Sequence, residues 1–444
     1  MTYFPHNKKN IDEMLSFIGK KSLNDLASPI PENLQSHGVD LPEGKPELEI
    51  SNYFDKLGKK NKPYEDIFLG AGAYNHFIPS TVSEIAGRQE FYTAYTPYQA
   101  EISQGTLQTI FEYQTYIANL TGMDVSNASM YDGGTSLAEA CVIATSSTRK
   151  NKLLVDKFVN PDYVEVLKTY MSALNIEIEI YESQPFSFDI ENFNKKWNKD
   201  YAAFVIASPN FFGSILDYSK AVETVKSDKS LIIHSVSEIM SLSVLKSPGT
   251  LGADIACGEA QSFGIPLSFG GPYLGFLSCK KDYLRKMPGR IVGQAKDRDG
   301  NICYTLTLTA REQHIRRELA TSNICSNHGL NAACASIYLS TVGRRGLRQC
   351  GLSNVEKSRY LFEKISKLEK FKVETSQAFF NEFVVKTSIN SEKIKDILEK
   401  NNILSFLPMK DFIKGYDDYY LLCATEMNTK ESIDKFVDIL GGLQ

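Results

Sequence analysis

Short apolar runs alternate with segments of helical periodicity in the middle of the chain. Between the first two runs, apolar side chains recur at helical spacing from Tyr163 to Tyr170, after a candidate N-cap, Asn160, and a proline at the first helical position. This alternation predicts a largely parallel sheet with helices on its faces, in which ligands lie at the carboxyl ends of the strands. The runs are rich in Ile, Val and Leu, as buried strands are, and lie at residues 152–156, 176–181, 202–207, 231–234, 253–257 and 274–279.

The two ends of the chain have different patterns. Ile11, Met14, Leu15 and Ile18 recur at the spacing of an amphipathic helix that ends near Gly19, and a proline-bearing, extended segment follows at 28–46. After the Gly-Arg-Arg-Gly segment at 343–346, helical patterns near 361–368, 394–398 and 433–440 alternate with strand-like runs at 383–385 and 419–423. The sequence therefore predicts an N-terminal helical and extended segment (1–62), a large α/β domain (63–343) and a small C-terminal α/β domain (344–444).

Composition narrows the class of protein. The 444 residues are 42% hydrophobic and 23% charged, which is ordinary for a soluble globular protein and excludes disordered, collagen-like and coiled-coil chains. The 49 basic and 53 acidic residues give a net charge of −4, so no basic excess indicates nucleic acid or an anionic membrane as a partner. The first residues lack the apolar core of a signal peptide, and no apolar run approaches the ~18 residues of a membrane span. We expect a cytoplasmic protein.

The cysteines and two short motifs indicate no metal or dinucleotide site. The eight cysteines are spread among apolar neighbours and are typical of buried free thiols. The closest metal-like pair, Cys325 and His328, lacks two further ligands at any recognised spacing. The Asp297–Asn301 segment favours a hairpin turn rather than a calcium loop, and Gly70-Ala-Gly72 lacks the third glycine of the dinucleotide fingerprint.

The most informative turn lies between Met130 and Cys141. Gly133 and Gly134 allow a tight turn, Ser136 and Glu139 have the spacing of a capping box, and an apolar helix follows. Backbone N–H groups at such a helix start can hold a phosphate. An ordinary capped helix explains the same residues.

Two further stretches carry polar and aromatic side chains. The segment 92–105 places three tyrosines around Pro97, which suits a polar-ligand pocket or an interface but is also common in surface packing. In the segment 309–325, three arginines precede Thr321, Ser322 and Asn323, a pattern that suits anion binding. A solvated helix face ended by a cap is the alternative, and His314 is expected to be structural.

Six long motifs in the same order resemble the glycine decarboxylase (P-protein) family of the glycine cleavage system, and in particular the α subunit of its split, two-chain form. They are Tyr3–His6, Phe68–His76, Pro97–Gly105, Ala128–Thr135, Ser208–Gly213 and Gln313–Glu318. The resemblance implies a pyridoxal-phosphate fold of the aspartate-aminotransferase-like type I, with a large, mostly parallel-sheet domain and a small α/β domain. This agrees with the architecture predicted from the pattern.

The family's chemistry needs a lysine that forms an imine with pyridoxal phosphate, and an acidic group near the pyridine nitrogen. In the segment that corresponds to the lysine's, Gly258–Gly264, Gln261 stands in its place, and an amide cannot form that imine. Glu238 corresponds to the region of the acidic residue. The resemblance therefore implies that a homologous β subunit binds the cofactor covalently and that this chain has no catalytic residue of its own.

In that family's reaction the complex, here an expected α2β2 heterotetramer, takes glycine, releases CO2 and passes the aminomethyl group to the lipoyl arm of H-protein. The chain would complete the β subunit's pocket across the interface. Two rivals remain open: a non-catalytic scaffold that stabilises the β subunit, and a self-sufficient enzyme that uses Lys220 or Lys246, which the missing lysine at 261 argues against. The side chains expected to reach the partner's cofactor are Tyr95, Tyr98, Gln99, Thr321, Ser322 and Asn323.

Overall fold

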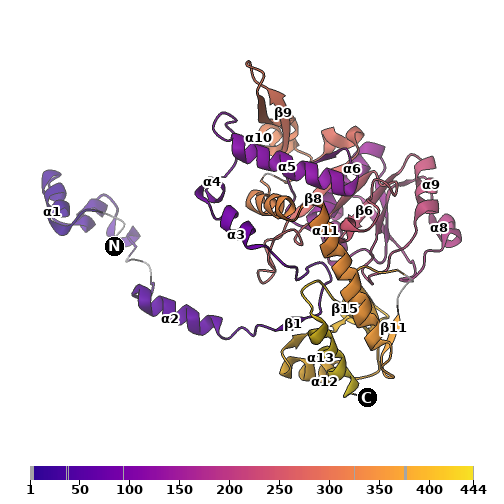
Figure 1. Cartoon of the computed structure of the whole chain (residues 1–444). Helices are drawn as coiled ribbons and strands as arrows, with labels where there is room; N and C mark the ends of the chain where they lie inside the picture. Colours follow the sequence, from indigo (N-terminus) through magenta and orange to yellow (C-terminus); the bar gives the residue numbers. More distant parts are fainter. Residues whose placement is uncertain are drawn as a thin grey trace. The chain divides into compact units, whose positions relative to one another are not determined.

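The computed structural model describes residues 5–36, 38, 40–93, 95–324, 326–374 and 378–443. Tyr3, Phe4 and Cys325, which the sequence analysis names, lie outside these residues. The chain divides into two compact units, Met1–Pro63 and Tyr64–Gln444, and Figure 1 shows its elements. No helix in the described part of the chain is long and apolar enough to cross a membrane.

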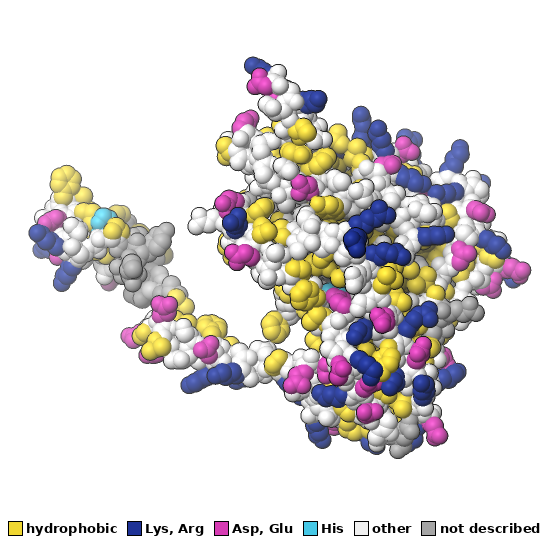
Figure 2. Space-filling model, in the orientation of Figure 1, with side chains coloured by type: hydrophobic (Ala, Val, Ile, Leu, Met, Phe, Trp, Pro, Cys, Tyr) yellow, Lys and Arg dark blue, Asp and Glu magenta, His cyan; other side chains and the backbone are white. Residues whose placement is uncertain are grey.

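The N-terminal unit consists of short helices joined by irregular segments. The predicted amphipathic helix is α1 (Lys8–Phe17), which Asn7 caps, and Gly19 follows it with a left-handed φ of 71°. Two 3-10 helices, Leu23–Ala27 and Glu32–Leu34, precede α2 (Glu47–Gly58). No residue of α2 is buried, and Figure 2 shows apolar side chains on the surface of this helix.

A seven-stranded sheet forms the centre of the larger unit. The strand order is β2-β8-β7-β6-β5-β3-β4, with antiparallel pairs β2–β8 and β8–β7 and parallel pairs elsewhere. All six runs predicted as strands belong to this sheet, so the prediction of a largely parallel sheet is confirmed. The bounds are β2 (Val125–Ser126), β3 (Lys152–Asp156), β4 (Glu177–Tyr181), β5 (Tyr201–Ala207), β6 (Leu231–Val236), β7 (Ile255–Glu259) and β8 (Gly275–Cys279).

Helices cover both faces of the sheet because its central strands are apolar on both sides. Along β5, Phe204 and Ile206 point into one core cluster while Ala203 and Val205 point into the other. α6 (Gly133–Thr148) and α7 (Pro161–Ala173) pack on the second side, and Asn160 caps α7 as predicted. On the first side lie α5 (Gln104–Thr121), α8 (Ile190–Lys196), α9 (Ser219–Ser227) and the first part of α11 (Gly329–Ile365).

Smaller elements complete this region. The predicted turn at Asp297–Asn301 joins an antiparallel hairpin, β9 (Ile291–Lys296) and β10 (Ile302–Thr307). The other short elements are α3 (Ser80–Ala86), α4 (Gln89–Tyr92), α10 (Gln313–Arg316) and 3-10 helices at Ile239–Ser243, Lys281–Lys286, Thr309–Arg311 and Arg317–Leu319.

The C-terminal part contains a second, four-stranded antiparallel sheet in the order β11-β12-β15-β14. α11 runs from the first sheet's region toward this one (Figure 1) and is interrupted at Gly343, whose φ of 59° and ψ of 178° are not helical. The predicted domain boundary at 343/344 coincides with this break and stays a prediction. The elements are β11 (Lys372–Glu374), β12 (Glu382–Lys386), α12 (Ser391–Lys400), β14 (Leu407–Pro408), a 3-10 helix at Met409–Asp411, β15 (Tyr419–Cys423) and α13 (Lys430–Gly441), with β13 (Ile403–Leu404) paired to β1 (Asp66–Ile67).

Gly213 lies where the two sheets approach each other. Its φ is 79°, and a Cβ at this position would overlap the backbone carbonyl of Glu382 at the start of β12. Replacing it with alanine should lower the free energy of unfolding by more than about 2 kcal/mol, because left-handed strain and overlap add. Gly415→Ala is the matched control, since Gly415 has a φ of 94° but nothing within 4 Å of its Cβ. Urea unfolding of both variants checks the prediction, and equal losses would contradict it.

Candidate functional site

The start of α6 lies at the edge of the central sheet where ligands of such folds bind. Asp132 is the N-cap: its Oδ1 accepts from the Thr135 N–H at 2.7 Å, and Thr135 Oγ1 accepts from the Asp132 N–H at 3.2 Å. The predicted capping box of Ser136 and Glu139 is therefore wrong, because the N-cap is Asp132, four residues earlier. Ser136 instead donates to the Asp132 carbonyl, and Glu139 accepts from Ser322.

The chain's own carboxylate occupies the helix start that the sequence suggested for phosphate. Glu259, the buried last residue of β7, accepts from the Gly133 N–H at 3.1 Å and, through its other oxygen, from the backbone N–H of Leu274 at 2.8 Å. A Cβ on Gly133 would overlap the ring of Tyr163, so this side is closed as well. Burial raises the pKa of Glu259 to about 7. The N–H groups of Gly133 and Thr135 at this helix start therefore already donate to carboxylates of the chain.

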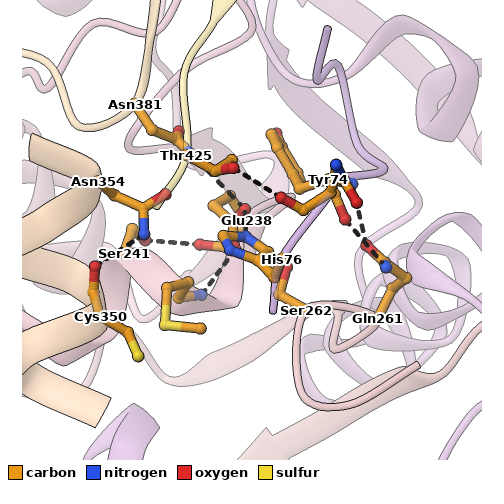
Figure 3. A network of polar contacts seen from close by, with 12 residues as sticks. Tyr74, His76, Glu238, Ser241, Gln261, Ser262, Cys350, Asn354, Asn381 and Thr425 are labelled. Atoms are coloured by element: carbon orange, nitrogen blue, oxygen red, sulfur yellow. Dashed lines mark hydrogen bonds and ion pairs between the residues drawn. The ribbon is translucent and has the colours of Figure 1, made fainter. Parts of the chain in front are cut away.

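Gln261 is buried and held in place by hydrogen bonds. Its side chain is 2% exposed and makes three hydrogen bonds: Oε1 accepts from the Tyr74 N–H at 2.9 Å, and Nε2 donates to the carbonyls of Tyr74 at 3.1 Å and Ile265 at 2.6 Å. Figure 3 shows Gln261 turned toward Tyr74. The amide therefore ties the loop before α3 to the end of β7, using both its acceptor and its donor.

A buried histidine bridges two acidic side chains beside Gln261. His76 Nε2 lies 2.9 Å from Glu238 Oε2, and His76 Nδ1 lies 2.9 Å from Glu426 Oε2. Ser262 donates to the other oxygen of Glu238, and Asn354 donates to Glu426. Burial alone would lower the pKa of His76, but the two carboxylates raise it to about 10, so the imidazole is charged at neutral pH. Figure 3 shows this network.

Glu382 closes the network on the side of the second sheet. It is buried, accepts from the Ala71 N–H at 2.6 Å and from the Tyr74 hydroxyl at 3.0 Å, and burial raises its pKa to about 7. The cavity left between Tyr74, Asn210, Glu238 and Glu382 measures only about 10 Å³. That is room for about one water molecule.

These residues do not fit a covalently held pyridoxal phosphate in this chain. The position that the resemblance assigns to the imine-forming lysine holds an amide with three hydrogen bonds, the Gly133 N–H at the helix start donates to Glu259, and the remaining cavity is far below the ~300 Å³ of a small-molecule site. Lys220 and Lys246, the alternative amines, are both exposed at the surface. The polar side chains inherited at this place stabilise the chain itself.

The raised pKa of Glu382 predicts a pH-dependent variant. A carboxyl group whose pKa is about 7 in the fold, against 4.5 as its ordinary value, stabilises the fold fully below pH 4.5, and that contribution is lost as the pH rises through 7. The free energy of unfolding of Glu382→Gln minus that of the parent chain should therefore be about 1–3 kcal/mol larger at pH 8 than at pH 5. Urea unfolding at both pH values measures this. The exposed Glu369→Gln is the control, and a parallel pH profile for Glu382→Gln would contradict the assignment.

The six side chains predicted to reach a partner lie outside this buried network. Tyr95 is 88% exposed, and Tyr98, Gln99, Thr321 and Asn323 are exposed too. Exposed tyrosines and amides on one subunit are available to a neighbouring chain. The roles of these residues in another chain's pocket stay a prediction.

The structure separates these side chains into two small groups. Tyr98 contacts Arg290 and the ring of His314, with ring centroids 5.9 Å apart in the second pair. Asn323 donates to the Tyr170 hydroxyl at 3.1 Å, and half-buried Ser322 donates to Glu139 Oε1 at 2.7 Å. The Ser322 hydroxyl therefore already donates a hydrogen bond within this chain.

The sequence analysis missed several residues of the buried network. Tyr74 and His76 lie in the Phe68–His76 motif, which was noted without assigning them a role. Glu382, Glu426 and Asn354 have no local sequence signal, because their partners lie about 70 to 350 residues away along the chain. The free cysteines are as expected only in part: Cys141, Cys257, Cys279 and Cys423 are buried, whereas Cys303, Cys334 and Cys350 are half-buried.

Solved structures resemble this chain over most or all of its length. A solved structure titled glycine decarboxylase (P-protein) of the glycine cleavage system, in inhibitor-bound form, is 37% identical, covers 100% of both chains and superposes with a TM-score of 0.91. A C-DES mutant with glycine covalently linked to its pyridoxal phosphate is 13% identical over 87% of this chain and 97% of its own, with a TM-score of 0.63. This second likeness shows the fold alone, and together they confirm the predicted pyridoxal-phosphate-dependent fold type I.

Sequence relatives extend over the whole chain. A probable glycine dehydrogenase (decarboxylating) subunit 1 from Desulfitobacterium hafniense is 46% identical and covers 100% of both chains. One from Listeria monocytogenes is 44% identical and covers 99% of this chain and 98% of its own. The family model of the glycine cleavage system P-protein matches residues 1–440. The chain therefore belongs to the glycine cleavage system P-protein family.

Proposed function

We propose that this chain is the α subunit of a two-chain glycine decarboxylase. The complex decarboxylates glycine with pyridoxal phosphate, which withdraws electrons from the α-carbon, and transfers the aminomethyl group to the lipoyl arm of H-protein. Family membership and the "subunit 1" names of full-length relatives support this proposal. The main support for assigning the cofactor to another subunit is Gln261. It stands at the position that the resemblance assigns to the lysine, and its side chain makes three hydrogen bonds there.

The cofactor then belongs to a homologous β subunit, in an α2β2 assembly. This chain's own site is filled by protein groups, so its contribution to catalysis comes from surface side chains that enter the partner's pocket. Tyr95, Tyr98 and Gln99 on one segment and Thr321 and Asn323 on another are exposed and carry hydroxyl or amide groups. Such groups can orient a polar ligand across an interface.

Borohydride trapping tests the absence of a cofactor imine in this chain. The isolated chain, incubated with pyridoxal phosphate and reduced, should carry no stoichiometric adduct, whereas its complex with a lysine-bearing homologue should carry one, on the homologue. A stoichiometric adduct on this chain would overturn the proposal.

A second experiment distinguishes a shared site from a scaffold. Tyr98→Phe and Asn323→Ala in the reconstituted complex should each lower the rate of CO2 release from glycine with lipoylated H-protein about tenfold, the loss expected for one hydrogen bond to a charged group. Tyr92→Phe is the matched control, because Tyr92 is exposed on the same segment. Unchanged rates with intact assembly, checked by size-exclusion chromatography, would favour a scaffold.

A further inference from the structure

Arg290 is a buried cation outside the network described above. Arg290 directly precedes β9 and is only 3% exposed. Its backbone carbonyl accepts from the Ala128 N–H at 2.8 Å. A buried guanidinium normally pairs with a carboxylate, since an unpaired buried charge costs several kcal/mol. The partners of Arg290 therefore decide what it does.

No carboxylate of the described residues lies within 4 Å of Arg290. Nη1 donates to Asn327 Oδ1 at 3.3 Å, Nη2 donates to the Tyr98 hydroxyl at 3.4 Å, and both distances are long. Nε is buried without a hydrogen-bond partner among the described residues. The nearby acidic side chain of Glu312 contacts His314 instead. By contrast, His76 lies between two carboxylates, and Asp254 is paired with Lys280.

Arg290 lines a cavity of about 220 Å³. The other polar side chains of the lining carry hydroxyl or amide groups, and none of the described lining residues is acidic. They are Tyr95, Thr96, Thr106, Thr109, Ser326 and Asn327. The cavity therefore combines one uncompensated positive charge with neutral donors. This is the arrangement that recognises an oxyanion, because a guanidinium offers parallel N–H groups to two oxygens.

We propose that this cavity binds an oxyanion, a phosphate group or a carboxylate, with Arg290 as its charged ligand. The Nη–H groups supply the charged donors, and the hydroxyl groups of the walls complete the shell. The bound anion supplies the negative charge that no described carboxylate of the chain provides. The proposal rests on this chain's residues alone and does not require the decarboxylase assignment.

Titration of the full-length chain with inorganic phosphate and, separately, with acetate tests the proposal by isothermal titration calorimetry. Saturable binding of either anion supports it, and which anion binds more tightly identifies the group preferred. Arg290→Gln should weaken binding about ten- to a hundredfold, the value of a hydrogen bond to a charged group. Arg345→Gln, which removes an exposed arginine elsewhere on the chain, should leave binding unchanged. Absence of binding, or equal binding by Arg290→Gln, overturns the proposal.

The stability of the ligand-free variant gives a second measurement. Loss of an arginine with a purely structural role would destabilise the chain, whereas loss of an anion-binding arginine would not. In anion-free buffer, Arg290→Gln should unfold at the same or a higher urea concentration than the parent chain, since it removes an unpaired buried charge. Saturating phosphate should then stabilise the parent chain by more than it stabilises the variant. A variant that is destabilised in anion-free buffer would show that Arg290 serves packing, and would overturn the proposal.

Discussion

Replacing His76 with leucine should lower the free energy of unfolding by about 3–5 kcal/mol, the cost of removing one member of a buried ion pair. Glu238, 3% exposed, and Glu426 both lose their cation, and no other described basic side chain lies within 4 Å of them. Urea unfolding at about pH 6 measures the full effect. The pKa of His76 is raised to about 10, so its contribution is complete below 6.5 and is lost as the pH rises toward 10; the pKa of Glu426 is lowered, so its share is present above 4.5.

His314→Leu is the matched control. His314 also lies beside a glutamate, with Nδ1 3.7 Å from Glu312 Oε2, but its side chain is 35% exposed. Glu312 is buried, but the 3.7 Å separation exceeds a hydrogen-bond distance and solvent reaches the His314 ring, so the loss should be smaller than that of His76→Leu. Equal losses in the two variants would mean that the His76 bridge adds nothing beyond packing.

Restoring a lysine at position 261 should not restore a cofactor site. Gln261→Lys leaves the Tyr74 N–H without its acceptor and places an amine in a buried position, so it should cost about 2–5 kcal/mol of folding free energy. Glu259 still occupies the start of α6, and the adjoining cavity is still about 10 Å³. Reduction with borohydride in the presence of pyridoxal phosphate, followed by peptide mapping, should show no adduct at residue 261.

Gln261→Met separates the two causes of the expected loss. Methionine has a similar length and no charge but also fails to accept from the Tyr74 N–H, so its cost should equal that of the lost hydrogen bonds alone. A smaller loss for methionine than for lysine isolates the cost of the buried amine. A stoichiometric adduct at the introduced lysine would show that the site is still open.

The strands of the central sheet were predictable because each is a short apolar run between turn residues. β3 matches its prediction at both ends, and β5 differs by one residue. β6 extends to Val236 past the predicted end at His234, because Ser235 is polar yet buried in the strand. Local periodicity therefore locates strands well and their ends less well.

The start of α6 shows why the local signal also misled. Ser136 and Glu139 have the spacing of a capping box, but Asp132 precedes two glycines and takes the cap with Thr135. The helix thus includes Gly133 and Gly134, which the pattern had placed in a turn. Two overlapping cap motifs compete in this sequence, and the aspartate's charge near the positive end of the helix dipole favours the first.

The glutamine at the position of the family's lysine could be identified only through the family resemblance. Its hydrogen-bond partners could be identified only from the structure. Gln261 and Tyr74 are 187 residues apart, and Glu382 and Tyr74 are 308 apart. No periodicity joins positions so distant. That this chain holds no cofactor imine stays a prediction from the resemblance, and the structure shows which side chains contact Gln261.

The carboxylate of Glu259 at the start of α6 has a consequence for how the chain is produced. Enzymes whose cofactor binds only the native state gain stability from it by mass action, and they lose that gain when the cofactor is scarce. Here the oxygen atom that accepts from the helix start belongs to the polypeptide itself. The chain should therefore fold to the same stability in vitamin B6-starved cells as in replete ones.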